Sequence, residues 1–284
     1  MNGVLERTLG ILELLAQHGE GMEMAAIADQ LDIPRSAVHR LLADLARCGY
    51  VRQTRDHGDY LLTTKLVSMG LSFLSKSGIV DIAQPLLDRL AEISGELVRL
   101  SVVDGNRLTW VARAQGARQG LRYDPDMGSD AQLSCSSSGH AWLAALSDDD
   151  ALALVAQQGL GNPQEFGPNA PTGLQAVMDM VRETRERGFS LTEETYTAGL
   201  NAMAAPVQLA GQPPMGIISI AGPMVRFTRE RMLALGPDLL SLAAQMAAAS
   251  SASPFFTKSA ARLANTASPA NSNGSGGLKR IYAA

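Results

Sequence analysis

The segment at residues 134–140, "SCSSSGH", gathers side chains whose types and spacing are compatible with nucleophilic catalysis. Cys135 and His140 lie five residues apart, with serines between them. A Cys–His or Ser–His hydrolase would use the histidine to accept the proton of the nucleophile. However, no Gly-x-Ser-x-Gly elbow surrounds the serines, and no carboxylate is obviously placed to orient His140. We therefore expect no enzymatic activity and keep a hydrolase only as the alternative function.

The same serines predict an anion site when they are considered with the helix that follows. Ser136, Ser137 and Ser138 come just before a helix that we expect to begin near Gly139. Free N–H groups and the helix dipole favour an anion there, and serine hydroxyls add hydrogen-bond donors. A carboxylate is the natural ligand. The alternative is that one serine caps the helix while the others lie in a loop.

A second segment, residues 33–51, combines an apolar face and a basic face on one predicted helix. Its apolar residues follow the i, i+3, i+4, i+7 spacing of a helix that packs on other elements. They are Val38, Leu41, Leu42 and Leu45. Residues 34–55 contain five arginines and one aspartate, a net charge of +4 in a chain whose formal net charge is −4. The polar side therefore concentrates positive charge.

Such a face suits a recognition helix in the major groove of DNA. Arg40 and His39 can reach base edges or phosphates, and short neighbouring side chains let the helix approach closely. Two further arginines lie on a predicted hairpin, from which they can contact the adjacent phosphates. The alternative is the solvated face of an ordinary surface helix. The predicted DNA contacts are Arg35, Ser36, His39, Arg40, Arg47, Arg52 and Arg55.

The elements around this helix favour the DNA-binding interpretation. Apolar periodicity predicts helices over residues 4–17 and 24–31, and a third begins at Pro34 and runs to about Arg47. Two β-type runs around the turn "DHGD" then predict a hairpin. Three helices followed by a hairpin are the order of a winged helix-turn-helix domain, which we assign to residues 1–64.

The remaining chain has a mixed pattern and reads as an α+β domain over residues 80–250. A linker helix over 65–79 precedes it, and the Ser/Asn/Gly-rich residues 251–284 are expected to form a disordered tail. Within the domain, helices are expected over 80–94, from about 139, and over 147–158, 172–187 and 228–249. Strands are expected over 97–105, 107–116, 201–209 and 215–223.

Composition limits the class of protein. A chain of 284 residues with 46% hydrophobic residues can form two domains with their own cores. Its two cysteines, Cys48 and Cys135, give neither a disulfide framework nor zinc-ligand spacing, which suits a reducing cytoplasm. The N-terminal apolar run contains charges, so we expect neither a signal peptide nor a membrane partner. We also expect no metal and no cofactor.

Several of these segments together resemble one known family. In the first half they are "RTLGILELLA", "AAIADQLDIPRSAVHRLLADLARCGYV" and "GDYLLTTKLVSMG", and in the second half "LSCSSSGHAWLA", "RGFSLTEETYTAGLNAMAAPV" and "GIISIAGP". They resemble the IclR family of bacterial transcriptional regulators over residues 4–250. The resemblance implies a winged helix-turn-helix domain joined to a GAF-like α/β domain that binds a small effector.

The resemblance also implies where an effector would bind. The family's contacts come from the serine segment, from the acidic run before "AAPV" and from the last strand. Ala202 stands where many members have a cysteine, and Ala221 where many have a second serine. Because these positions offer fewer hydrogen bonds, we expect a larger, more apolar effector such as an aromatic acid. The predicted effector contacts are Met127, Ser136, Ser137, Ser138, Glu193, Ala202, Ser219 and Ala221.

The resulting prediction is a ligand-responsive regulator that binds a palindromic operator as a homo-oligomer, either a dimer or a dimer of dimers. A single recognition module buries too little surface for genomic specificity, so such modules are usually paired. The linker helix has an apolar face at Leu66, Met69 and Phe73, and the first helix has a similar face at Leu5 and Leu9. We expect the linker helix to pack on the winged-helix domain and on its symmetry mate, and so to couple the two domains. The alternative for this helix is a passive linker whose apolar residues fold back on their own domain. The alternative is a small-molecule hydrolase with an accessory winged helix.

Overall fold

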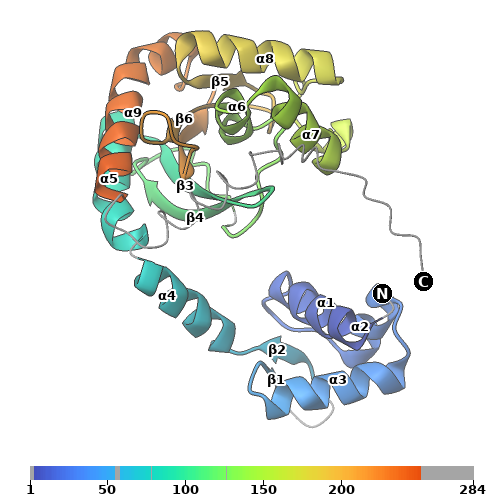
Figure 1. The fold of residues 1–284 in the computed structure, drawn as a ribbon. Coiled ribbons are helices and arrows are strands. Elements are labelled where there is room, and N and C mark those ends of the chain that lie inside the picture. The colour runs from blue at the N-terminus through green and yellow to red at the C-terminus, as the bar shows by residue number, and fades with distance from the viewer. Residues whose placement is uncertain (1–2, 55–57, 78, 126, 251–284) are drawn as a thin grey trace, which may run out of the picture. The chain divides into compact units, whose positions relative to one another are not determined.

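The structure is a computed structural model, and it describes residues 3–54, 58–77, 79–125 and 127–250 (Figure 1). The chain divides into two compact units, Met1–Lys76 and Ser77–Ala284. The division falls inside the predicted linker segment, which here forms helix α4 (Lys65–Ser77). The expected disordered tail, residues 251–284, lies outside the described residues.

Three helices and one hairpin make up the first unit. The helices are α1 (Val4–Ala16), α2 (Met24–Leu31) and α3 (Arg35–Arg47). Strands β1 (Val51–Gln53) and β2 (Tyr60–Leu62) pair antiparallel. A bridge between Met22 and Tyr60 ties the hairpin to the segment before α2. The predicted order of three helices and a hairpin is confirmed.

Turn chemistry sets the bounds of α3. Asp32 adopts a left-handed conformation with φ of 51°, which turns the chain sharply between α2 and α3. Pro34 has an extended conformation and occupies the N-cap, so the helix begins one residue later than expected. Gly49 ends this region with φ of 77°, a conformation that glycine adopts without steric cost.

The apolar stripe predicted on α3 lies in the core of the first unit. Val38, Leu41, Leu42 and Leu45 are all buried, as the periodicity requires. They pack against Ile11 and Leu15 of α1 and Ile27 of α2. The other apolar face of α1 is not part of this core, because Leu5 and Leu9 are exposed.

A five-stranded antiparallel sheet organises the second unit. Its strands are β3 (Leu97–Asp104), β4 (Arg107–Gln115), β5 (Ser190–Glu193), β6 (Leu200–Val207) and β7 (Gly216–Pro223). Their order across the sheet is β4-β3-β7-β6-β5. Strand β5 was not expected from the sequence, because it is short and lies at the edge of the sheet.

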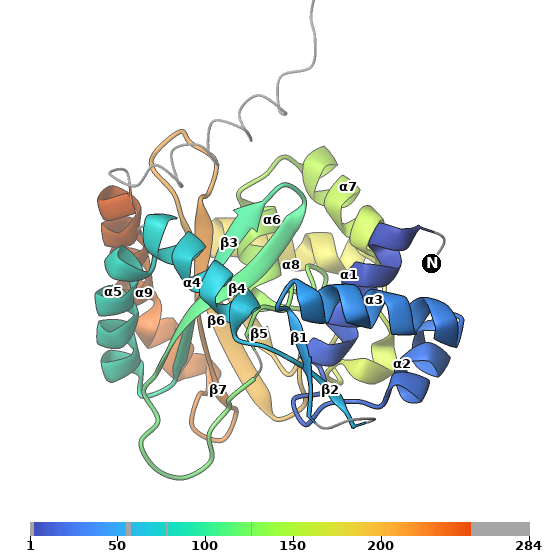
Figure 2. The same cartoon turned by 90° about the horizontal axis from the view of Figure 1, so that it is seen from below.

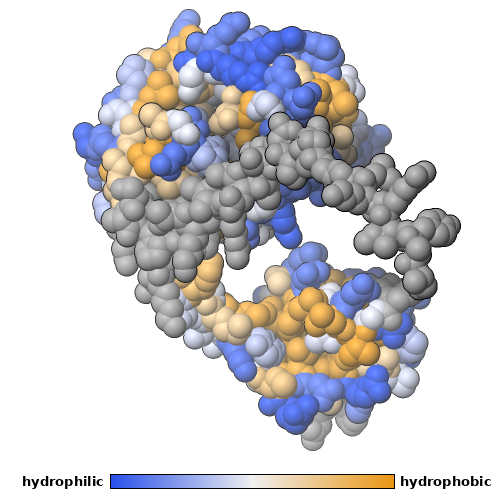
Figure 3. Space-filling model, in the orientation of Figure 1, coloured by the Kyte–Doolittle hydropathy of each residue, from blue (hydrophilic) through white to orange (hydrophobic). Residues whose placement is uncertain are grey.

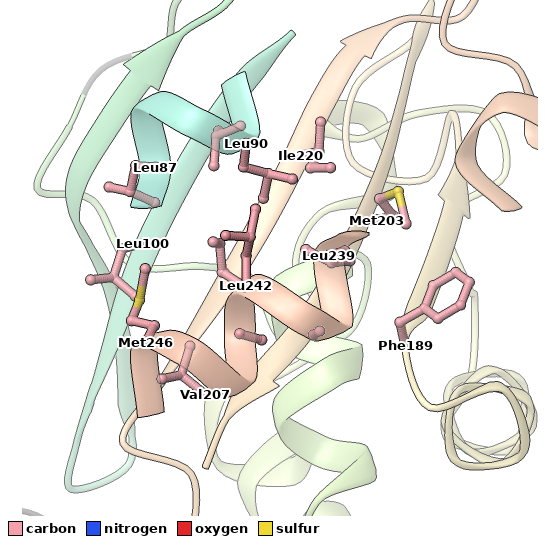
Figure 4. Packing of buried hydrophobic residues seen from close by; sticks show 14 of the residues in the cluster. Leu87, Leu90, Leu100, Phe189, Met203, Val207, Ile220, Leu239, Leu242 and Met246 are labelled. Carbon is pink, nitrogen blue, oxygen red and sulfur yellow. The ribbon is translucent and has the colours of Figure 1, made fainter. Parts of the chain in front are cut away.

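Helices cover both faces of this sheet (Figures 1 and 2). On one face, α5 (Ile79–Ser94) and α9 (Arg229–Ser250) enclose the larger core. Figure 4 shows Leu87 and Leu90 of α5 meeting Leu239, Leu242 and Met246 of α9 over the strands. The other face carries α6 (Ser137–Ala144), α7 (Asp148–Gln158) and α8 (Leu174–Arg187), and a short 3-10 helix, η1 (Pro163–Glu165), lies between α7 and α8.

Helix α9 is the one described helix that is long and apolar enough to cross a membrane. Length and composition alone make it a weak candidate, because the core helix of a globular domain has the same properties. Met232, Leu239 and Met246 of α9 are fully buried in the core that the helix shares with α5 and the sheet.

Candidate functional site

The exposed side of α3 carries the predicted DNA contacts of that helix. Arg35, Ser36, His39, Arg40 and Arg47 are all exposed. Their positions follow from the burial of the opposite stripe, because a helix of 3.6 residues per turn must present the remaining positions to solvent. The predicted face therefore exists as a surface.

The arginines on this face differ in their partners. Arg47 donates to Asp44 over 2.8 Å, which raises the pKa of Arg47 and holds its side chain along the helix. Arg35 lies 3.9 Å from Asp29, a longer and exposed pair. Among the described residues no ion pair involves Arg40. Arg40 is therefore the cation of α3 that is available to a nucleic acid without first breaking an ion pair.

The hairpin lies next to α3 and adds a second polar wall. One pocket, with a volume of about 410 Å³, is lined by His39 of α3, Gln53 of β1 and Gly58 of the turn. Arg52 lies on β1 and is exposed. Arg55 is another predicted contact, and it lies outside the described residues. The arrangement brings a recognition helix and a wing to one side of the unit.

Lys65 has a structural role that the sequence analysis missed. Its ammonium donates to the carbonyl oxygen of Cys48 over 2.6 Å and lies 4.4 Å from the centre of the Tyr50 ring. A cation at the end of α3 satisfies a free carbonyl and complements the helix dipole. It therefore fastens the start of α4 to the end of the recognition helix.

In the second unit, a small, partly open cavity of about 20 Å³ lies beside the beginning of α6. Ser136 and Ser137 line it from the helix, and Ala202 and Ala221 line it from the sheet. Alanines at these two strand positions leave the wall apolar. The residues that line the cavity in addition to these four are Arg99, Trp110, Tyr123, Thr192, Tyr196, Thr197, Leu200 and Asn201.

At the start of α6, the hydroxyl of Ser136 caps the helix, whereas the main-chain N–H groups of Ser137 and Ser138 remain available to a ligand. Ser136 is the N-cap, and its hydroxyl oxygen accepts a hydrogen bond from the N–H of Gly139 at 3.0 Å. Gly139 packs so closely on Leu133 that an added Cβ would lie 2.6 Å from that carbonyl oxygen. Capping thus accounts for Ser136, whereas the first N–H groups of the helix, at Ser137 and Ser138, have no partner within it.

Arg99 is the charged residue of the cavity, and the sequence analysis did not select it. Arg99 is only 6% exposed. Its guanidinium carbon lies 3.9 Å from the centre of the Trp110 ring and 5.7 Å from the centre of the Tyr123 ring. Burial lowers the pKa of Arg99 below its ordinary value. A buried arginine within strand β3, whose neighbours are almost all apolar, is the sequence signal that could have found it.

Aromatic rings form the rest of the wall. Tyr196, in the turn between β5 and β6, meets Trp110 edge to face with ring centres 6.0 Å apart and lies 5.8 Å from Phe166. Burial raises the pKa of Tyr196, so its phenol is neutral at pH 7. The cavity therefore combines one cation, neutral hydroxyls and flat apolar surfaces.

Four of the eight predicted effector contacts do not line this cavity. Glu193 points to Arg229, with which it pairs at 2.7 Å, and Ser219 directs its hydroxyl to the carbonyl of Arg99 at 3.5 Å. Ser138 is buried within α6, and Met127 packs at the edge of the core under α7 and α8. The neighbouring Thr192 lines the cavity in place of Glu193.

Cys135 and His140 do not form a catalytic pair in this geometry. The Nε2 atom of His140 donates to the carbonyl of Ser134 over 2.7 Å, and burial lowers the pKa of the imidazole. Burial also raises the pKa of the Cys135 thiol to about 12, so the thiol is protonated at pH 7. A nucleophilic thiolate needs the opposite shifts. The described residues also include no group of three or more potential metal ligands.

A winged helix-turn-helix unit and a separate sheet domain with a small cavity define a DNA-binding regulator that responds to a small molecule. Residues 71–248 match the family described as "Bacterial transcriptional regulator IclR C-terminal". Residues 4–55 match the "IclR helix-turn-helix domain". The chain therefore belongs to the IclR family of bacterial transcriptional regulators, a family that is not enzymatic.

Individual relatives agree with this assignment. The chain is 29% identical to the acetate operon repressor of Salmonella typhimurium over 243 residues, which are 85% of this chain and 88% of the relative. A crystal structure of a regulator from Alicyclobacillus acidocaldarius has a TM-score of 0.75 at 20% identity, covering 87% of this chain and 98% of the other. An IclR homologue from Microbacterium hydrocarbonoxydans was crystallised with 4-hydroxybenzoate. Its structure has a TM-score of 0.72 at 18% identity, and the match covers 88% of this chain and 100% of the homologue.

Proposed function

We propose that this regulator acts as a homo-oligomer in the cytoplasm, binding a palindromic operator and sensing a small, partly apolar carboxylic acid. Its DNA-binding domain would comprise residues 1–64, its linker helix 65–79 and its effector domain 80–250. The single observation that carries the proposal is the exposed face of α3, on which Arg40 has no ion-pair partner among the described residues.

The proposed DNA contacts divide by role. Arg40 and His39 read base edges in the major groove, since they project from the middle of the exposed face of α3. Arg35 and Ser36, at the N-terminal end, and Arg47 contact phosphates, as do Arg52 and Arg55 from the wing. Asp44 competes with the phosphate for Arg47. Arg47 should therefore contribute less than Arg40.

Exposed apolar residues support the homo-oligomer. Leu5 is 70% exposed on α1, and Met69 and Phe73 of α4 are 52% and 56% exposed. Figure 3 shows hydrophobic side chains gathered on the surface of α1 and on α4. Apolar surface of this kind is usually buried by a partner. A second copy of the chain is the partner we propose, because a palindromic site requires two recognition helices about one DNA turn apart.

The effector proposal rests on the cavity beside α6. A helix N-terminus next to a buried cation favours an anion, and the alanines at 202 and 221 favour an apolar body. The Microbacterium relative was crystallised with 4-hydroxybenzoate, an acid of this description. We therefore place the effector of this regulator among small carboxylic acids with an apolar body.

Selection from random duplex DNA tests the proposal. The full-length protein should enrich a palindrome whose half-sites lie about 10 base pairs apart, and light scattering should show an even number of subunits. Arg40→Ala should abolish the enrichment, while Arg182→Ala, on the exposed surface of α8, should not change it. Enrichment of a single half-site by a monomer, or of no sequence, would contradict it.

A further inference from the structure

Arg99 is a buried cation without a counter-ion among the described residues. Arg99 is 6% exposed, and its Nε atom is buried with no hydrogen-bond partner. Buried arginines are ordinarily paired, because removing a charge from water is costly unless another charge or several hydrogen bonds replace the water. The ion pairs of the described residues include none for Arg99.

A neighbouring arginine shows the ordinary solution. Arg113 of β4 lies directly opposite Arg99 in the register of β3 and β4. Its guanidinium donates to Asp124 over 2.5 Å and to the carbonyl of Pro125 over 3.3 Å. Of these two arginines on neighbouring strands, Arg113 therefore has an ion-pair partner and is partly exposed, whereas Arg99 is buried and has no ion-pair partner among the described residues.

Two aromatic rings, together with a hydrogen bond to the Tyr123 side chain, take the place of the missing carboxylate. The guanidinium of Arg99 stacks on Trp110 at 3.9 Å, with Tyr123 at 5.7 Å on the loop after β4. Cation–π contacts offset only part of the cost of removing this charge from water. The buried charge of Arg99 is therefore only partly compensated, and a bound anion would stabilise it.

The remaining groups of the cavity indicate the body of that anion. Trp110, Tyr123 and Tyr196 supply ring surfaces, and Thr192 supplies a hydroxyl on the edge strand. The cavity has a volume of about 20 Å³, whereas a benzene ring occupies a cavity of about 150 Å³. The cavity as described is therefore too small for a ring. A ring can bind only if side chains of the wall move, and the guanidinium of Arg99, which now covers Trp110, is one of them.

We propose that Arg99 binds the carboxylate of an aromatic monocarboxylic acid, whose ring then stacks where the guanidinium now contacts Trp110. The planar guanidinium can hold a carboxylate through two parallel hydrogen bonds, and Ser137 can add its main-chain N–H at the start of α6. One cation matches one carboxylate. This inference rests on the proposed function, and it assigns the residue and the ligand class of that site.

Binding of matched ligands to the full-length protein tests the proposal. Isothermal titration would compare benzoate and 4-hydroxybenzoate with benzamide, which has the same ring and no charge. We expect the wild type to bind the acids and to bind benzamide at least 30-fold more weakly. Equal binding of benzamide would overturn the role of Arg99, and binding of neither acid would overturn the aromatic class.

Variants separate a ligand contact from a structural role. Arg99→Gln should lose acid binding by 30-fold or more and still melt at or above the wild-type temperature, because it removes an unpaired buried charge. Arg99→Lys keeps the charge without the planar fork and should bind with intermediate affinity. The control Arg182→Gln removes an exposed arginine of the same unit and should bind as the wild type does.

Two outcomes for Arg99→Gln would overturn the proposal. One is acid binding equal to that of the wild type, and the other is a lower melting temperature that benzoate restores in the variant as it does in the wild type. DNA binding is measured on the same preparations. A protein that binds benzoate through Arg99 without any effect on DNA would contradict the proposed function while leaving this inference intact.

Discussion

Arg40 on α3 and Arg99 on β3 are both arginines without an ion-pair partner among the described residues, yet their surroundings are opposite. Arg40 is exposed, whereas Arg99 is 6% exposed and stacked on Trp110. A cation in water remains solvated until DNA arrives, so its position costs the fold little. A buried cation loses that solvation, which makes its retention inside the domain informative about a ligand.

The comparison also distinguishes two kinds of recognition. Phosphate and base contacts at an exposed surface depend on salt and on the register of two recognition helices. A contact in a small buried cavity depends on desolvation and on movement of the surrounding side chains. The following variants change one of these features at a time, beginning with the largest expected effect.

Loss of the apolar face of α4 should have the largest effect on DNA binding. The double variant Met69→Ser, Phe73→Ser removes two exposed apolar side chains. If they join two subunits, separating the modules should lower operator affinity by about 10²–10⁴-fold, since linked binding is lost. Fluorescence anisotropy on a full operator and on a half-site would measure this.

The same variant should still bind an effector, because its substitutions lie outside the second unit. Loss of operator affinity or of the effector response with intact effector binding assigns coupling to this helix. Wild-type DNA binding and response would mean that the linker is passive.

The buried stripe of α3 should be more sensitive to truncation than its exposed face. Leu42 is fully buried, so Leu42→Ala should lower the free energy of unfolding by about 2–5 kcal/mol. Arg40→Ala should leave it within about 0.5 kcal/mol of the wild type. Urea denaturation followed by circular dichroism would compare them. A similar loss of stability in both variants would contradict the assignment of the two faces.

Arg40 and Arg52 should differ in what they contribute to DNA binding. Arg40→Ala should weaken specific binding by about 1–3 kcal/mol and relax preference at one base pair. Arg52→Ala should weaken binding to all sequences and reduce its salt dependence. Anisotropy titrations at several salt concentrations, on operator and on unrelated DNA, separate the two. If Arg40→Ala weakens binding equally on every DNA sequence, Arg40 contacts only phosphate.

The buried imidazole of His140 should make stability depend on pH. Burial lowers its pKa from the ordinary value of 6.5, so the unfolded chain takes up a proton that the folded domain does not. Stability is therefore lost as the pH falls below about 6.5, by at most about 1.4 kcal/mol per pH unit. His140→Gln keeps a donor for Ser134 and should reduce this slope. An unchanged slope would show that other groups cause it.

Periodicity predicted the first unit well because its helices each bury a single stripe. Val38 and Leu42 fall in the core, and the helix ends follow from Pro34 and Gly49. The cavity was harder to predict. Arg99 lies in a strand with both faces buried, and its place in the cavity wall follows from tertiary contacts with Trp110 and Tyr123 that the strand pattern does not contain. Ser136 was predicted to contact the ligand, but in the structure its hydroxyl oxygen accepts the capping hydrogen bond from the N–H of Gly139.

Measurement of operator affinity with and without an aromatic acid tests the central claim most directly. Full-length wild-type protein and the Arg99→Gln variant would be titrated onto a labelled operator in the presence of 4-hydroxybenzoate or benzamide. We predict that the acid changes the operator affinity of the wild type by about 5–150-fold, the range of ordinary coupling energies, and that it changes that of the variant by less than twofold. An acid that binds the wild type without changing its operator affinity would contradict the account.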